Sequence, residues 1–105
     1  MPRILMVEPD SKLAGLYAAA LELRGHVVDT CRLAQEAISQ ADASKPDLVL
    51  LELGLTAHGG IEFLYEFRSY VDWRAVPVII VSHTPADTFD GSRDVLERQL
   101  GVTAY

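Results

Sequence analysis

Three polar side chains that could do chemistry directly follow apolar stretches of the chain: Glu8, Glu52 and Ser82. A further carboxylate, Asp10, lies two residues beyond the first of them. Carboxylates and a hydroxyl that converge at one place make a site for a cation or a phosphoryl group. The competing interpretation is that any strand end meets water and carries a polar residue there. Periodicity alone does not decide between the two.

The stretches that precede these side chains are typical of strands. They are continuous and rich in branched residues, as in parallel strands that are buried on both faces: 4–7, 48–51 and 76–81. A shorter strand is predicted at 26–31, and helical spacing is found at 11–25, 34–43, 61–71 and 92–101. The alternating order predicts an α/β doubly wound parallel sheet with right-handed crossovers. Ligands bind beyond the carboxyl ends of such strands, so the three polar side chains converge if their strands are neighbours.

The first predicted helix has apolar residues at helical spacing. We expect these residues to face the sheet: Leu13, Leu16, Tyr17, Ala20 and Leu21. Gly25 is placed to end this helix.

Composition limits the classes of protein to which the chain can belong. Its 105 residues fit a single domain, 1–105, and half of them are apolar. A formal charge of −6 repels phosphate backbones and anionic lipids, so neither nucleic acid nor a membrane surface is expected as a direct partner. The single Cys31 and the absence of a signal-peptide core predict a cytoplasmic setting.

Several motifs occur in an order that resembles a known family. These are "ILMVEPD", "PDLVLLEL", a "GG" pair eight residues past Glu52, "VPVIIVS" and "GVTAY". The chain is similar over essentially its whole length to receiver domains of two-component response regulators. The resemblance implies a flavodoxin-like fold with strand order 2-1-3-4-5, in which the fifth strand and the last helix are truncated or absent here.

The resemblance also implies roles for individual positions. In the family, an aspartate that ends the third strand accepts a phosphoryl group from a histidine kinase, and an acidic pair after the first strand holds Mg²⁺. A Ser or Thr ends the fourth strand, and an aromatic switch residue precedes a lysine in the fifth. By position, Glu52 replaces the phosphoacceptor, Glu8 and Pro9 the acidic pair, Ser82 the hydroxyl and Tyr105 the switch residue. The lysine would fall two residues beyond Tyr105.

Two of these positions depart from the family in ways that bear on chemistry. Glu52 is one methylene longer than aspartate, and a displacement of about 1 Å already costs orders of magnitude in rate. Pro9 supplies no carboxylate, and Glu8, Glu52 and Asp10 are a poor substitute for the octahedral oxygen set that Mg²⁺ prefers. We therefore expect no cofactor, and weak Mg²⁺ binding at most.

These departures predict a pseudo-receiver, which keeps the fold and acts without phosphorylation as a non-enzymatic interaction module. The expected partners are proteins of a signalling pathway: a histidine kinase, an output domain or another regulator. Glu52 would be a fixed charge that partly mimics the phosphorylated state and acts through Ser82 and Tyr105.

Two alternative functions stay open at the level of sequence. One is a working, Mg²⁺-dependent phosphoacceptor in which Asp10 restores the metal site. The other is a small-ligand sensor whose pocket lies beneath loops that carry His58 and His83. In addition, an apolar fourth strand near a sheet edge would invite pairing with a second copy, giving a homodimer.

Overall fold

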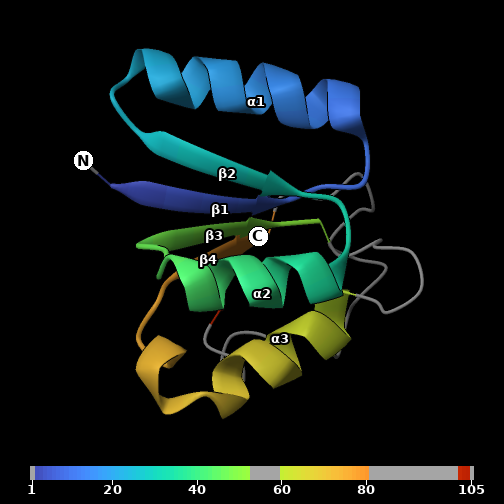
Figure 1. Ribbon diagram of the computed structural model, residues 1–105, viewed down its shortest axis with the longest axis vertical. Coiled ribbons are helices and arrows are strands. Elements are labelled where there is room, and N and C mark those ends of the chain that lie inside the picture. Colours follow the sequence, from blue (N-terminus) through green and yellow to red (C-terminus); the bar gives the residue numbers. More distant parts are fainter. Residues whose placement is uncertain (1, 53–59, 81–101, 105) are drawn as a thin grey trace.

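The fold is a five-stranded parallel sheet with helices on both faces, as seen in a computed structural model (Figure 1). The structure describes residues 2–52, 60–80 and 102–104. Its elements, in chain order, are β1 (Arg3–Val7), α1 (Ser11–Leu23), β2 (Val27–Cys31), α2 (Ala34–Ala43), β3 (Leu48–Leu51), α3 (Gly60–Ser69), the 3-10 helix η1 (Val71–Trp73), β4 (Val78–Ile80) and β5 (Val102–Ala104).

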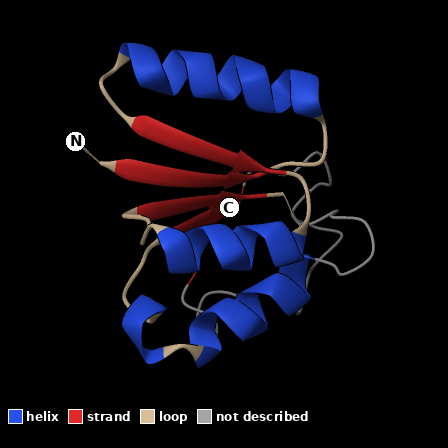
Figure 2. Cartoon of the chain, in the orientation of Figure 1, coloured by secondary structure: helices blue, strands red, loops and turns tan. Residues whose placement is uncertain are grey.

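The strands are arranged in the order β2-β1-β3-β4-β5, and every neighbouring pair is parallel. Helix α1 covers one face of the sheet, and α2 and α3 cover the other (Figures 1 and 2). This confirms the doubly wound architecture and the strand order predicted from the sequence. The first strand lies inside the sheet, between β2 and β3, so its carboxyl end lies beside that of β3.

The main hydrophobic core lies between the sheet and helices α2 and α3. Strand residues with odd numbers in β1 and β3 point into it, because side chains alternate between the two faces of a sheet. Aromatic rings fill its lower part, with Phe63 stacked on Phe67 at 5.5 Å and Phe67 on Trp73 at 5.0 Å between ring centroids. Ala37 and Ala41 of α2 are fully buried here.

Helix α1 is delimited by a capping residue at its start and a glycine at its end. Asp10 is the N-cap, and its carboxylate accepts hydrogen bonds from the backbone N–H groups of Lys12 and Leu13 at 2.9 and 3.2 Å. Gly25, just past the helix, has a φ of +89°, a left-handed conformation that glycine adopts without strain. The predicted stop at Gly25 is therefore confirmed.

The predicted inner face of α1 is wrong in part. Ala14 is buried and Leu13 and Leu21 are partly buried, but Leu16 is 68% exposed and Ala20 is also exposed. The helix is apolar around most of its circumference, so the sequence pattern had no polar face that would fix its rotation.

The C-terminal part contains a short fifth strand. This strand, Val102–Ala104, pairs with β4, in keeping with the strand order and the shortened fifth strand expected from the resemblance. The helix predicted at 92–101 lies outside the described residues. Among the described helices, none is long and apolar enough to cross a membrane.

Candidate functional site

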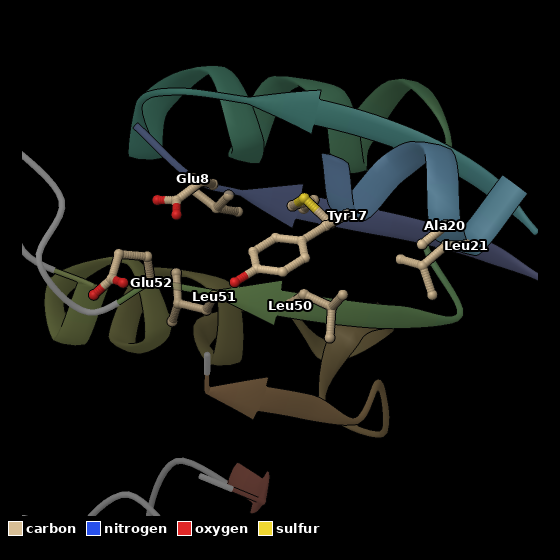
Figure 3. Close-up of a pocket in the computed structure, with 9 residues that line it drawn as sticks. Glu8, Tyr17, Ala20, Leu21, Leu50, Leu51 and Glu52 are labelled. Carbon is tan, nitrogen blue, oxygen red and sulfur yellow. The ribbon is translucent and has the colours of Figure 1, made fainter. Parts of the chain in front are cut away.

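Two buried carboxylates, Glu8 and Glu52, lie next to each other at the carboxyl ends of β1 and β3. Val7 and Leu51, the residues before them, are paired in register across the two strands. The backbone N–H of Glu8 donates to the Cys31 carbonyl at 2.9 Å, and that of Glu52 donates to the Val7 carbonyl at 3.0 Å. Figure 3 shows both side chains just beyond the strand ends. The sheet register thus fixes their backbone positions.

Burial makes these glutamates unusual among the charged residues. Glu8 is 5% exposed and Glu52 is 7% exposed, and they are the charged side chains that fall into the buried class among the described residues. A buried charge is retained at a cost in desolvation, which nearby polar partners offset. The pair therefore places two carboxyl groups at the edge of the sheet where ligands of such folds bind.

The two residues that follow Glu8 do not add a third carboxylate to this pair. Pro9 is partly buried and carries no carboxylate. Asp10 is exposed and its carboxylate is used as the N-cap of α1. Within 2–52, 60–80 and 102–104, no three His, Cys, Asp or Glu side chains are grouped so that they could hold a metal ion.

Several predicted site residues lie outside the described residues. These are Ser82 and Tyr105, the expected hydroxyl and switch positions, and the loop histidines His58 and His83. Their roles stay predictions.

A pocket of about 210 Å³ adjoins the two glutamates on the α1 side of the sheet. Its walls come from β1, β3 and α1, and its lining is mostly apolar. The ring of Tyr17 extends from α1 across this pocket toward β3, with Leu50 and Leu51 beneath it (Figure 3). Tyr17 was expected on the inner face of the helix, but no link to the site was predicted for it. The signal available in the sequence was that Tyr17 lies about two turns into a helix that must fold back over β1.

Cys31, whose carbonyl accepts the hydrogen bond from Glu8, is not a reactive thiol. Burial raises the pKa of Cys31 to about 11, and the negative charges of Glu36 and Asp29 add to this increase. A thiol with such a pKa stays protonated near neutral pH, and the thiolate is the nucleophilic form. Cys31 is thus a small buried side chain, in keeping with its 8% exposure.

Comparison with known proteins supports the interpretation of this fold. Residues 4–96 match the family described as the response regulator receiver domain. Among curated relatives, the KDP operon transcriptional regulatory protein KdpE of Escherichia coli is 32% identical over 97% of this chain and 47% of its own length. The transcriptional regulatory protein TcrA of Mycobacterium tuberculosis is 32% identical over 85% of this chain and 35% of its own length.

Solved structures agree in fold. A sensor protein from Polaromonas sp. JS666 has a TM-score of 0.87 at 24% identity and aligns with 99% of this chain and 81% of that chain. The chemotaxis response regulator CheY4 of Vibrio cholerae has a TM-score of 0.85 at 18% identity, with 99% and 83% covered. The chain spans less than half the length of the two curated relatives named above. On the family match and these relatives, the chain belongs to the response regulator receiver domain family.

Proposed function

We propose that this receiver domain signals by binding other proteins and does not accept a phosphoryl group. The observation that carries the proposal is that Glu52 is buried at the end of β3 and beside Glu8. The resemblance assigns this position to the family's phosphoacceptor aspartate. The proposal is that Glu52 acts as a fixed negative charge.

The geometry of a glutamate argues against phosphoryl transfer at this position. The strand pairing of β3 with β1 fixes the backbone of Glu52, so the extra methylene moves the carboxylate outward by roughly one C–C bond length. Catalysis of phosphoryl transfer depends almost entirely on positioning and electrostatic stabilisation. A displacement of about 1 Å therefore lowers the rate by orders of magnitude.

The described residues also fit a Mg²⁺ site poorly. Mg²⁺ requires near-octahedral oxygen ligands and is usually held by carboxylates together with water and phosphate oxygens. Glu8 and Glu52 offer two carboxylates, Pro9 offers none, and Asp10 is engaged at the start of α1. Weak Mg²⁺ binding at most is proposed, and no other cofactor.

A fixed charge at Glu52 would bias the domain toward one signalling state. It carries one negative charge, against the roughly −1.5 to −2 of a phosphoryl group. The bias is proposed to act through Ser82 and Tyr105. The proposed partners are a histidine kinase, an output domain or another regulator of the same pathway, since these are the proteins with which receiver domains of this family work.

Incubation with Mg²⁺ and a small phosphodonor such as acetyl phosphate, followed by intact-mass measurement, tests the proposal. We expect no gain of a phosphoryl group by the wild-type chain. The matched control is the double variant Glu52→Asp with Pro9→Asp, which restores both family carboxylates and is expected to gain more phosphoryl group than the wild type. Stoichiometric phosphorylation of the wild-type chain that is lost in Glu52→Gln would overturn the proposal.

The fixed-charge role has its own test. Glu52→Gln keeps the shape of the side chain and removes its charge, so we expect backbone amide shifts that extend from residue 52 to Ser82 and Tyr105 in two-dimensional NMR spectra. Glu66→Gln, on the exposed side of α3, is the control and should change only its neighbours. If Glu52→Gln leaves the signals of Ser82 and Tyr105 in place, Glu52 does not act through them.

A further inference from the structure

We infer that the outer edge of β2 is a docking site for an extended, positively charged segment of another protein, which adds to the sheet as a further strand. The inference goes beyond the proposed role of Glu52, because β2 and α2 form a separate part of the surface. Three observations lead to it: the direction of the backbone groups of β2, the regularity of this strand, and a polar groove between β2 and α2.

The outer edge of β2 presents backbone groups that no described strand pairs. β2 is the last strand on its side of the sheet. The Val27 N–H donates to the Pro2 carbonyl at 2.9 Å, and from there the strand pairs with β1 in register as far as Cys31. In such a ladder, alternate residues direct their backbone groups to the neighbouring strand and the residues between them direct theirs away from it. The N–H and carbonyl groups of Val28 and Thr30 therefore point away from the sheet.

β2 lacks the features that commonly keep edge strands from pairing. These features are a proline, a lysine, a bulge or a very short strand. β2 is five residues long, pairs with β1 without a register shift, and contains neither proline nor lysine. Its one charged residue, Asp29, is bound to Arg3 of β1 at 2.7 Å. At the opposite edge, β5 has three residues and a register shift against β4, so β2 is the more suitable of the two for adding a strand.

A polar groove of about 490 Å³ adjoins β2 where this strand meets α2. It is lined by hydroxyl-, amide-, thiol- and carboxyl-bearing residues of the two elements: Thr30, Cys31, Gln35, Glu36, Ser39 and Gln40. Side chains of an added strand alternate between the two faces of the sheet, so every second one lies on the α2 side, beside this groove. Polar side chains that can form hydrogen bonds fit such a lining better than apolar ones.

The charges at the groove favour a cationic segment. Glu36 lines the groove, and no lysine or arginine is among the residues that line it. Burial raises the pKa of Cys31 in the groove wall, and the charges of Glu36 and Asp29 raise it further, so both carboxylates act at this place. Arg3 is paired with Asp29, and Arg32 is exposed beyond the end of β2. A lysine or arginine on the α2 side of an added strand therefore meets a complementary charge.

A second copy of the chain fits this edge poorly. The register that bonds the outward groups of Val28 and Thr30 in both copies places the two Asp29 side chains opposite each other. Like charges directly opposite each other in a sheet are destabilising. The formal charge of −6 on each copy adds to the repulsion. The occupant is therefore a different chain with a positive charge.

Peptide titration followed by two-dimensional NMR tests the inference. The probe is the heptapeptide Thr-Lys-Val-Lys-Val-Lys-Thr, whose lysines fall on one face of an extended strand. We expect saturable amide shifts in 27–31 and 35–40, and weaker binding in high salt. The same peptide with its three inner residues N-methylated keeps its charge but loses donors for strand pairing, so its affinity should fall about tenfold or more. A peptide with glutamate in place of each lysine should not bind.

Variants of the chain provide matched controls. Thr30→Pro removes an N–H that β1 does not use, a change that an edge strand tolerates, and should weaken binding of the lysine peptide about tenfold. Thr30→Ser keeps both the N–H and the hydroxyl and should bind as the wild type does. Glu36→Gln should weaken binding about twofold to fivefold, and Asp42→Asn, which removes the same charge from α2 outside the groove, should weaken it less. Circular dichroism confirms that the variants are folded.

Four outcomes would overturn the inference. The first is the absence of saturable shifts in 27–31 with the lysine peptide. The second is equal binding of the N-methylated peptide, which would mean attraction by charge without strand pairing. The third is equal binding of the glutamate peptide. The fourth is a shift of the 27–31 signals with the concentration of the chain alone, which would assign the edge to a second copy. No phosphodonor is present, so these outcomes are independent of whether Glu52 accepts a phosphoryl group.

Discussion

At the scale of single residues, Asp10 decides what kind of acidic site the chain presents. It lies two positions after Glu8, yet its carboxylate holds the first turn of α1 and its backbone is extended, with φ −85° and ψ 105°. Glu8 and Glu52 are instead buried beside each other. The third carboxylate is thus close to Glu8 in the sequence, but it caps helix α1 instead of joining the two buried glutamates.

The capping role of Asp10 gives a direct prediction. Asp10→Ala removes the acceptor for two backbone N–H groups, so we expect it to lower the free energy of unfolding by about 1 kcal/mol, within a range of roughly 0.5–2 kcal/mol. Urea denaturation measures the loss. Asp42→Ala, an exposed acid at the end of α2, is the control, with an expected change of about 0.5 kcal/mol or less. An unaltered midpoint in Asp10→Ala would mean that the carboxylate is free for another role.

That Glu8 and Glu52 lie side by side could be predicted from the sequence, because both follow apolar stretches and parallel strands end at a common edge. The helix-capping role of Asp10 could not be predicted, since spacing does not distinguish a helix N-cap from a metal ligand. The same limit applies to Tyr17. Its place on one side of a helix was visible, but whether its ring reached the site depended on how far α1 leans over β3 (Figure 3).

At the scale of elements, α1 is the helix whose sequence defines its ends better than its sides. Asp10 and Gly25 mark the ends through a cap and a left-handed residue. The sides carry alanine and leucine almost everywhere, so periodicity predicts a helix without predicting its rotation. In α2 the pattern is amphipathic, and the two alanines on its apolar side, Ala37 and Ala41, are buried.

Two glycines of this region should respond to alanine in opposite ways. A Cβ added at Gly15, in the middle of α1, meets no atom within 4 Å, so Gly15→Ala is expected to raise the free energy of unfolding by about 0.5–1 kcal/mol. A Cβ added at Gly25 also meets no atom within 4 Å, but the φ of Gly25 is +89°, a conformation that L-residues rarely adopt. Gly25→Ala is therefore expected to lower stability by about 1 kcal/mol.

Both changes are measured by urea denaturation at one and the same protein concentration. Each glycine variant serves as the control for the other, because the added methyl group is the same. A loss of stability in Gly15→Ala would contradict an open outer surface of α1.

At the scale of the whole molecule, the hydrophobic core is one-sided. The main cluster lies between the sheet and α2 with α3, and among the described residues of β3 and β4 those on the α1 side, Leu48, Leu50 and Ile79, are only partly buried. The strand order and the placement of helices on two faces were predictable from the alternation of strands and helices and from the family resemblance. How completely each face is covered was not, because coverage depends on packing between elements distant in the sequence.

Alanine substitutions of two adjacent leucines in β3 test this difference between the two faces of the sheet. Leu51 is 0% exposed within the core, so Leu51→Ala is expected to cost about 2–5 kcal/mol of stability. Leu50 points to the α1 side and is partly exposed, so Leu50→Ala is expected to cost clearly less. Thermal or urea unfolding of the two variants compares them directly. Equal losses would mean that both faces of the sheet are equally packed.

The position of β1 between β2 and β3 bears on how the chain assembles during synthesis. Its two neighbours, β2 and β3, are complete by residue 51, so three adjacent strands and both crossover helices come from the first half of the chain. The N-terminal part of a protein leaves the ribosome first and can begin to fold there. Strands β4 and β5 would then add one after the other to a template that already exists, in the order in which they are translated.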